Sequence, residues 1–575
     1  MRGLFSNGMR PRVLLLAMVF LAWFAVIQGR LVQLQVINHA RLKAEVVEHS
    51  QNEMVVYPKR GTIYDRNGKI LARSLPADSV YYSPLKSESP ARQMDQIDKL
   101  RIPLDLSDKE IARVRSRIED KAKWILIKRK IEPEAAGRVS ALDIKGMVLQ
   151  DENKRNYPQG SLAAHVLGGV GIDDNGLAGV ELQRNTLLEG EKGRRLILLD
   201  ARRKSFSFET IKEAKPGEDL YLTIDETIQY IAESELEKAV SSCGADWGTV
   251  IIASPFTGEI LAIANRPTYN PNDFPPEPAE TGRDLAIQNT FEPGSTFKLV
   301  TAAAARELGK IGMGETYDCR KGSIIVGGSA VKDHAQMGIL TFPEVIIESS
   351  NVGAIMIAQE IGEERLYQMI RTLRFGERTG IDLPGEEYGI CRPLSSWSRS
   401  SLRIAIGYEI NVTAIQILRA MNVIATGGSL VKPRITREAG YQTDRPVQVL
   451  SEKTSSELSA IFRRVVEDGT GRPARLDGFD IAGKTGTAQK YDPAIRAYSS
   501  ALHLASFVGF VPAADPVITM IVVIDEPKGI QQYGGQVAAP VFRDIAARVL
   551  RYLREAPKPK PQPLVTARME KANQP

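Results

Sequence analysis

The feature that most constrains this chain is one unbroken apolar run close to its N-terminus. All fifteen residues from 13 to 27 are apolar, and Arg10 and Arg12 lie just before them. In a helix these residues span about 22 Å, which is less than the roughly 30 Å of a bilayer core. We therefore expect the helix to continue to residue 34, with Gln28 and Arg30 reaching toward the interface or facing a partner helix.

A cleaved signal peptide is the alternative interpretation of this run. No pattern of small residues typical of a cleavage site follows Ile27, so the sequence favours an uncleaved anchor over residues 13–34. The positive-inside rule then places residues 1–12 in the cytoplasm and the rest outside. We expect a single-pass protein of the cytoplasmic (inner) membrane whose folded body is extracytoplasmic, or periplasmic.

Composition narrows the function classes. The chain has 575 residues, 43% of them hydrophobic and 25% charged, which is globular composition for about two to four folded units. A net charge of +6 over this length makes no basic field, so we expect no nucleic-acid partner. Three cysteines are too few for a disulfide scaffold.

The sequence after the anchor divides into two predicted domains and a tail. Residues 35–225 are charged and patchy and contain no catalytic constellation, whereas residues 226–554 hold every motif discussed below. The last segment, 555–575, is rich in proline and polar residues, so we expect disorder. The expected elements are a polar helical stretch near 107–140, a helix over 226–243, a hairpin within 249–264, a buried strand over 518–524 and a helix over 539–554.

Ser295 and Lys298 are the first candidate catalytic pair. They lie in FEPGSTFKLV, where a Pro-Gly turn leads into apolar residues at helical spacing. Residues three apart share a helix face, so the lysine amine can reach the serine hydroxyl. A serine with a nearby lysine that can be neutral is the arrangement that acyl transfer needs when no histidine base is present.

The same S-x-x-K spacing occurs elsewhere in the chain, so context must choose between the copies. SPLK carries a proline inside the motif, and SAVK and SLVK follow Gly-Gly pairs without starting a long helical pattern. We interpret these three as chance matches. They are Ser83/Lys86, Ser329/Lys332 and Ser429/Lys432.

Two further motifs follow in order. Ser349 and Asn351 belong to an S-x-N before an apolar helical run, where they are candidates for a polar relay, although serine and asparagine are also ordinary helix caps. Lys484, Thr485 and Gly486 form the only K-[ST]-G of the chain. They lie in a segment with a strand-like residue pattern, and Thr487 follows them. A strand edge binds extended peptides through its main chain, and a lysine with threonines can hold a terminal carboxylate.

Two rival enzyme classes remain open at this point. GFDIAGKT matches the G-x-x-x-x-G-K-[ST] phosphate-binding loop, and IVVIDE resembles a Walker B strand. Against an ATPase, the residues around Lys484 resemble a strand, and no helix pattern follows them. A histidine-dependent hydrolase is disfavoured because no G-x-S-x-G elbow occurs and the five histidines are scattered.

The ordered set S-x-x-K, S-x-N and K-T-G resembles the motifs of penicillin-binding proteins and class A β-lactamases. The sequence around these motifs resembles class B penicillin-binding proteins over nearly all of the chain after the anchor. The segments that carry this likeness are RGTIYDRNGKILA, YPQGSLAAHVLGGVG, GLAGVELQRNTLLEGEKG, DHAQMGILTFPEVIIESSNVGA, FGERTGIDLPGE and YGGQVAAPVF. One departure is Glu409, where the family often has glycine.

The resemblance implies an α+β protein with a pedestal domain of the dimerisation type and a transpeptidase domain. The latter would hold an antiparallel five-stranded sheet flanked by helices, with no cofactor and no metal. The substrate would be the D-alanyl-D-alanine end of a stem peptide, and β-lactams would acylate the same serine. Ser295 would be the nucleophile and Lys298 its base, with the Lys298 pKa lowered by burial and by Lys484.

The remaining roles are also implied by the resemblance. Ser349 and Asn351 would relay the proton and fix the peptide amide, Lys484, Thr485 and Thr487 would hold the carboxylate, and the N–H groups of Ser295 and Thr487 would form the oxyanion hole. The S-S-N form and the single anchor are similar to the division-specific type (FtsI type). Its partners would be a polytopic glycan polymerase (FtsW type) and other division proteins. An elongation-specific transpeptidase, a β-lactamase or a β-lactam sensor of the same fold remain alternatives.

Overall fold

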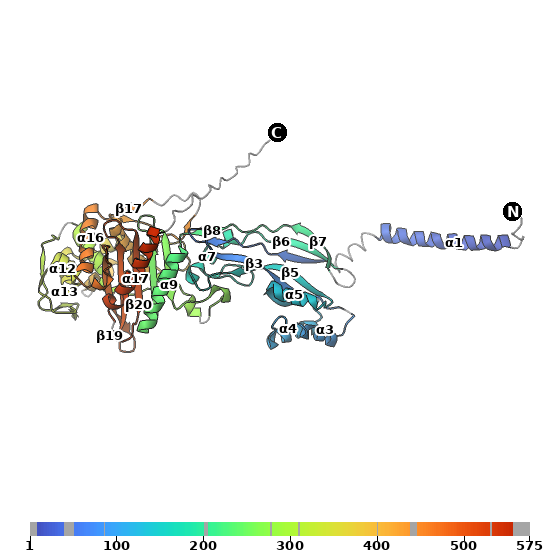
Figure 1. The fold of residues 1–575 in the computed structure, drawn as a ribbon, viewed down its shortest axis with the longest axis horizontal. Helices are drawn as coiled ribbons and strands as arrows, with labels where there is room; N and C mark the ends of the chain where they lie inside the picture. The colour runs from blue at the N-terminus through green and yellow to red at the C-terminus, as the bar shows by residue number, and fades with distance from the viewer. Residues whose placement is uncertain are drawn as a thin grey trace, which may run out of the picture. The chain divides into compact units, whose positions relative to one another are not determined.

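A computed structural model describes residues 9–38, 51–85, 87–122, 124–199, 205–276, 279–308, 311–398, 401–437, 445–529 and 532–555 (Figure 1). The chain forms two compact units. One consists of residues 1–59, 74–154 and 190–217, and the other of residues 60–73, 155–189 and 218–575. The expected disordered tail lies outside the described residues, except for Glu555.

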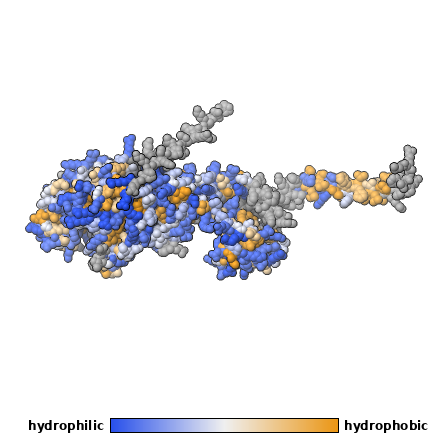
Figure 2. Space-filling view, viewed as in Figure 1, coloured by the Kyte–Doolittle hydropathy of each residue, from blue (hydrophilic) through white to orange (hydrophobic). Residues whose placement is uncertain are grey.

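The N-terminal helix is long and apolar. Helix α1 (Met9–Val32) continues into a π-helical turn, η1 (Gln33–Ile37), and residues 13–37 could cross a membrane by their length and composition. Its apolar side chains are exposed and form a run of orange in Figure 2. A single-pass membrane anchor fits this helix.

The first unit contains two groups of elements. Strands β1 (Gln51–Val56), β6 (Gly193–Leu199) and β7 (Ser205–Lys212) form an antiparallel sheet in the order β1-β6-β7. Helices pack against the other strands around a separate core. These elements are β3 (Ile70–Tyr82), α3 (Pro90–Asp98), α4 (Asp108–Glu119), β4 (Ile125–Ile131), α5 (Pro133–Ala141) and β5 (Met147–Asn156). The first residues of β3 and the last two of β5 belong to the second unit.

The prediction of a polar helical stretch near residues 107–140 is wrong in part, because strand β4 lies between helices α4 and α5. The side chains of Ile125, Ile127 and Ile131 are buried, which suits a strand that packs on one face. Pro133 then starts α5, where a proline is tolerated because the first helical N–H needs no partner.

In the second unit, segments far apart in the sequence meet around a buried carboxylate. Glu181 Oε2 lies 2.6 Å from Arg60 Nε, and its Oε1 lies 2.6 Å from Arg155 Nε. All three side chains are at most 1% exposed. This unit also contains the short elements β2 (Ile63–Tyr64), α6 (Ala164–Leu167), α7 (Gly179–Gln183), α8 (Asn185–Leu188), β8 (Leu220–Leu222) and β16 (Thr436–Arg437).

The centre of the second unit is an antiparallel five-stranded sheet. Its strand order is β10-β9-β20-β19-β18. This sheet, with helices on both faces, confirms the expected α+β fold. The strands are β9 (Trp247–Ala253), β10 (Ile260–Arg266), β18 (Ala482–Asp492), β19 (Ala497–Val511) and β20 (Ile518–Asp525).

Both faces of the sheet are buried, and alternate side chains belong to different cores. Val250, Phe507 and Val522 pack in the core that holds α9 (Glu226–Cys243) and α17 (Gly534–Glu555). Ile251 and Val508 pack in the opposite core, which holds the other helices. These are α11 (Lys298–Glu307), α12 (Phe342–Ile347), α13 (Asn351–Ile361), α14 (Glu363–Thr372), α15 (Ala414–Ala425) and α16 (Glu452–Glu467).

The sequence predicts several of these elements correctly. Helix α9 has the expected bounds, the β9–β10 hairpin is present, and β20 is a fully buried strand. Helix α17 begins at Gly534, five residues before the expected start at 539, with Pro540 inside it. Gly534 and Gly535 are weak helix formers, so the sequence does not indicate the earlier start.

Candidate active site

Ser295 lies where the chain makes a close approach to the edge of the sheet. It belongs to a 3-10 turn, η4 (Gly294–Phe297), directly before α11, and its side chain is half-buried. Gly294 has φ +57°, and a Cβ at this position would lie 2.9 Å from the carbonyl oxygen of Thr487 on β18. Glycine therefore permits the turn that brings Ser295 beside β18.

Lys298 is fully buried at the start of α11. Its Nζ donates to the backbone oxygen of Ser349 (2.5 Å), to Ser349 Oγ (3.2 Å) and to Asn351 Oδ1 (2.8 Å). Among the described hydrogen bonds, none joins Lys298 to Ser295. The structure thus brings the S-x-x-K and S-x-N motifs together, through the hydrogen bonds of Lys298.

The S-x-N turn is held in an unusual conformation. Ser349 has φ +59°, a left-handed conformation that is uncommon for a residue with a Cβ. Ser350 caps α13, because its Oγ accepts a hydrogen bond from Gly353 N (2.9 Å). Asn351 Nδ2 donates to the backbone oxygen of Lys332 (2.9 Å). This turn directs Ser349 Oγ toward both lysines of the site.

Asp333 is a site residue that the sequence analysis missed. Its carboxylate accepts hydrogen bonds from the backbone N–H groups of Asn351 and Val352 and from Ser350 Oγ. The carboxylate therefore supports the N-terminus of α13, where negative charge is favourable. The local sequence around Asp333 resembles an ordinary hairpin end, so no sequence pattern signals this contact.

The K-T-G motif lies on the outermost strand of the sheet. Lys484 is fully buried, and its Nζ donates to Ser349 Oγ (2.9 Å) and to the backbone oxygen of Thr485 (3.2 Å). A Cβ on Gly486 would lie 2.7 Å from Thr296 Cγ2. Among the described strands, β18 pairs with β19 alone, so its other edge can accept an extended peptide.

Two more residues that the sequence analysis missed contact the threonines of this motif. Thr470 Oγ1 lies 2.8 Å from Thr485 Oγ1, and the Gly534 N–H donates to Thr487 Oγ1 (3.0 Å). Gly534 begins α17, so a helix N-terminus points toward Thr487. These contacts orient two hydroxyl groups at the edge of β18.

Burial perturbs both lysines. The pKa of Lys298 is well below its usual value because of desolvation, with a further lowering from the positive charge of Lys484. Both causes were expected from the sequence. Desolvation also lowers the pKa of Lys484 to about 7. A lysine that is neutral near pH 7 can accept a proton from a serine hydroxyl.

The competing motifs lie elsewhere. Ser329 and Lys332 are the two ends of a strand, β13 (Ser329–Lys332), and Ser429 starts another, β15 (Ser429–Leu430). Lys86 lies outside the described residues. The phosphate-loop match is also excluded, because Lys484 and the residues after it form β18 rather than a helix.

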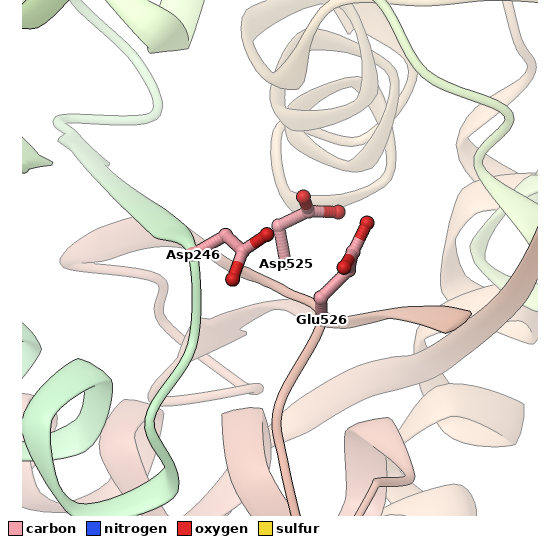
Figure 3. A group of neighbouring side chains, drawn as sticks. All are labelled: Asp246, Asp525 and Glu526. Atoms are coloured by element: carbon pink, nitrogen blue, oxygen red, sulfur yellow. The ribbon is translucent and has the colours of Figure 1, made fainter. Parts of the chain in front are cut away.

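A group of three carboxylates could be mistaken for a metal centre. Oxygens of Asp246, Asp525 and Glu526 lie within 4.8 Å of one another (Figure 3). However, Lys490 Nζ lies 2.9 Å from Asp525 Oδ2, and Lys528 Nζ lies 2.9 Å from Asp246 Oδ1. We interpret the group as an ion-pair network.

Comparisons with known proteins agree with this geometry. Residues 248–547 match the family described as penicillin binding protein transpeptidase domain, and residues 55–222 match the penicillin-binding protein dimerisation domain. The chain is 34% identical over 552 residues to stage V sporulation protein D of Bacillus subtilis, covering 93% of this chain and 85% of that protein. The chain belongs to the class B penicillin-binding proteins.

Other relatives of this penicillin-binding protein carry the name of the reaction. It is 31% identical over 569 residues to peptidoglycan D,D-transpeptidase FtsI of Escherichia coli K12, covering 96% of this chain and 93% of that protein. It also resembles the crystal structure of penicillin binding protein 3 from Mycobacterium tuberculosis in complex with aztreonam. The TM-score is 0.66 and the sequence identity 28%, and the match covers 88% of this chain and 98% of that chain. This penicillin-binding protein is a peptidoglycan D,D-transpeptidase.

Proposed function

We propose that this transpeptidase cross-links stem peptides at the division septum through an acyl-enzyme on Ser295, and that β-lactams acylate the same serine covalently. The observation that carries the proposal is the buried network in which Lys298 and Lys484 share Ser349 Oγ. Lys298, whose pKa is lowered, lies one helical turn after Ser295, which precedes α11. This arrangement supports nucleophilic attack by Ser295 without a histidine.

In the proposed first step, the Oγ of Ser295 attacks the carbonyl carbon of the D-alanyl-D-alanine bond, and neutral Lys298 takes the proton of this hydroxyl. The N–H groups of Ser295 and Thr487 receive the developing oxyanion. The C–N bond then breaks, and a proton passes by way of Lys298 and Ser349 to the amine of the departing D-alanine. An ester between the stem peptide and Ser295 remains.

Lys484, Thr485 and Thr487 are assigned to the terminal carboxylate of the donor. Gly486 has no side chain, so it leaves room for η4 beside the strand. Asn351 would hold the amide of the donor peptide. In the second step an amine of another stem peptide attacks the ester, forms the cross-link and returns the proton to Ser295 Oγ.

The chemistry is tested with purified full-length protein, a D-alanyl-D-alanine peptide and an amine acceptor. D-alanine release with formation of a peptide–acceptor product supports the proposal. Release of D-alanine with water as the sole acceptor would assign the protein to hydrolysis instead. Rapid hydrolysis of a penicillin adduct would indicate a β-lactamase.

The finer role and topology rest on the likeness to the FtsI type. We assign residues 1–12 to the cytoplasm, 13–34 to the membrane, 35–225 to a pedestal and 226–554 to an extracytoplasmic catalytic domain. A polytopic glycan polymerase of the FtsW type would supply the strands. Depletion should then give filamentous cells, and a fluorescent fusion should collect at midcell. Rounded cells with a dispersed fusion would instead indicate an elongation role.

A further inference from the structure

The protein itself occupies a main-chain group on the free edge of β18. Tyr408 Oη accepts a hydrogen bond from the backbone N–H of Gln489 across 3.3 Å. Tyr408 belongs to the segment that contacts the nucleophile turn, because the Gly294 N–H donates to the carbonyl oxygen of Gly407 (3.1 Å). A side chain from outside the sheet therefore covers part of the strand edge that lies beside Ser295.

The main chain of Gln489 faces away from β19. Gln489 lies opposite His503 in the β18–β19 pair, and the His503 carbonyl oxygen accepts a hydrogen bond from the Glu526 N–H (2.8 Å) at the end of β20. This opposed pair is therefore not hydrogen-bonded, and such pairs recur at every second residue of an antiparallel ladder. The N–H groups of Thr487 and Gln489 thus lie on the same free edge, two residues apart.

The proposed position of the donor peptide leads it along this edge toward Gln489. Its terminal carboxylate is assigned to Lys484 and Thr485, and its reacting carbonyl to the Thr487 N–H, so the donor runs antiparallel to β18. Hydrogen-bonded positions recur every second residue. The carbonyl that acylates the residue before the penultimate D-alanine therefore comes opposite the Gln489 N–H, which Tyr408 occupies in the structure.

The ring of Tyr408 is held in place from two sides. The Arg403 guanidinium lies over it, 5.5 Å from the centroid, and the Tyr498 ring packs edge-on at 5.1 Å. The Tyr408 N–H also donates to the backbone oxygen of Arg403 (3.2 Å). The hydroxyl is thus fixed beside Gln489, although its 3.3 Å bond is longer than most N–H···O hydrogen bonds. A donor carbonyl can replace it at little cost.

We propose that Tyr408 is a specificity-determining residue that limits the main-chain pairing of the donor to Thr487. A donor carbonyl that reaches the Gln489 N–H must displace the tyrosine hydroxyl, so it exchanges one hydrogen bond for another and gains little affinity. The same contact covers an edge N–H with which another strand could pair. This inference deepens the proposed function and rests on the donor position given there.

The first experiment compares two donors of equal chain length, acetylglycyl-D-alanyl-D-alanine and pentanoyl-D-alanyl-D-alanine. Only the first has the carbonyl that comes opposite Gln489. The readout is the ratio of their kcat/KM values for D-alanine release, so a general change of the site, which acts on both donors, cancels. In Tyr408→Phe this ratio should rise about fivefold over the wild-type ratio, the effect of one hydrogen bond that no longer has a competitor.

Tyr498→Phe is the matched control. The Tyr498 hydroxyl donates to Glu292 Oε1 (2.9 Å), and Arg403 lies over this ring as well, 5.4 Å from its centroid. No described hydrogen bond joins the Tyr498 hydroxyl to Gln489, so this variant should keep the wild-type ratio. A wild-type ratio in Tyr408→Phe, or an equal rise in both variants, would overturn the proposal.

The second experiment tests the contact without catalysis. Hydrogen exchange followed by mass spectrometry should show faster exchange of the Gln489 amide in Tyr408→Phe than in the wild-type protein, because the N–H loses its partner. Tyr498→Phe should exchange like the wild-type protein. Unchanged exchange in Tyr408→Phe would show that the hydroxyl does not cover this N–H and would overturn the proposal. Release of D-alanine from neither donor by the wild-type protein would contradict the proposed function instead.

Discussion

Lys484 Nζ lies 2.9 Å from Ser349 Oγ, so the edge strand β18 shares a hydrogen bond with the turn before α13. Ser349 Oγ also contacts Lys298, which places two buried lysine side chains around one hydroxyl. The positive charge of Lys484 adds to burial in lowering the pKa of Lys298. This relationship gives the pH dependence of acylation a structural cause.

The first prediction concerns that dependence. In Lys484→Met, the Lys298 pKa should rise, because the nearby positive charge is lost. Lys298 must be neutral to act as base, so the acidic limb of the pH profile of penicillin acylation should move to higher pH. Lys490→Met, on the same strand but in an ion pair with Asp525, should leave the limb in place. An unshifted limb in Lys484→Met would show that the two charges are not coupled.

The second prediction concerns stability. Lys484 is protonated below about pH 7 in the folded state but remains protonated to about 10.5 when unfolded, so the unfolded chain binds more protons between these values. Stability should therefore rise with pH across this window, by at most about 1.4 kcal/mol per pH unit for one lysine. Urea unfolding at pH 7, 8 and 9 should show the rise for the wild-type protein relative to Lys484→Met. Parallel curves would contradict it.

The third prediction tests the close approach of β18 and η4. A Cβ at Gly486 would lie 2.3 Å from Ser506 Oγ and 2.7 Å from Thr296 Cγ2. Gly486→Ala should push the strand from the turn, slow acylation by about tenfold or more and lower Tm. Gly314→Ala, where nothing lies within 4 Å of the added Cβ, is the matched control. Acylation of both variants at the wild-type rate would mean that the spacing is not critical.

The fourth prediction separates anchor and chemistry. A chain that begins near Asn38 should be soluble and still acylated by penicillin, because the site residues all lie beyond 290 and α1 is exposed and apolar. Size-exclusion chromatography and penicillin labelling check this. An insoluble or inert product would show that the anchor contributes to the fold.

The sequence predicts the parts of the site that depend on local order. The members of each pair, Ser295 with Lys298, Ser349 with Asn351 and Lys484 with Thr485, lie within three residues of each other, so spacing and helix or strand patterns reveal them. The five-stranded sheet was implied by family resemblance rather than by periodicity. Strand β4 was missed because the charged residues at its half-buried positions resemble the polar face of a helix.

The supporting residues could not be predicted, because their partners are distant in the sequence. Asp333 becomes part of the site only when its hairpin meets the start of α13, and Thr470 only when its loop meets Thr485. Neither contact leaves a spacing or composition signal. Only the folded arrangement brings these groups together.

The assignment of Ser295 as the acylated nucleophile can be checked by intact-mass analysis and peptide mapping after incubation with benzylpenicillin. We expect one adduct, on the peptide that contains Ser295. It should be absent in Ser295→Ala, whose thermal unfolding should remain close to that of the wild-type protein. Ser83→Ala, Ser329→Ala and Ser429→Ala should each retain the adduct. A full adduct on Ser295→Ala, or loss of the adduct in one of the other three variants, would contradict the assignment.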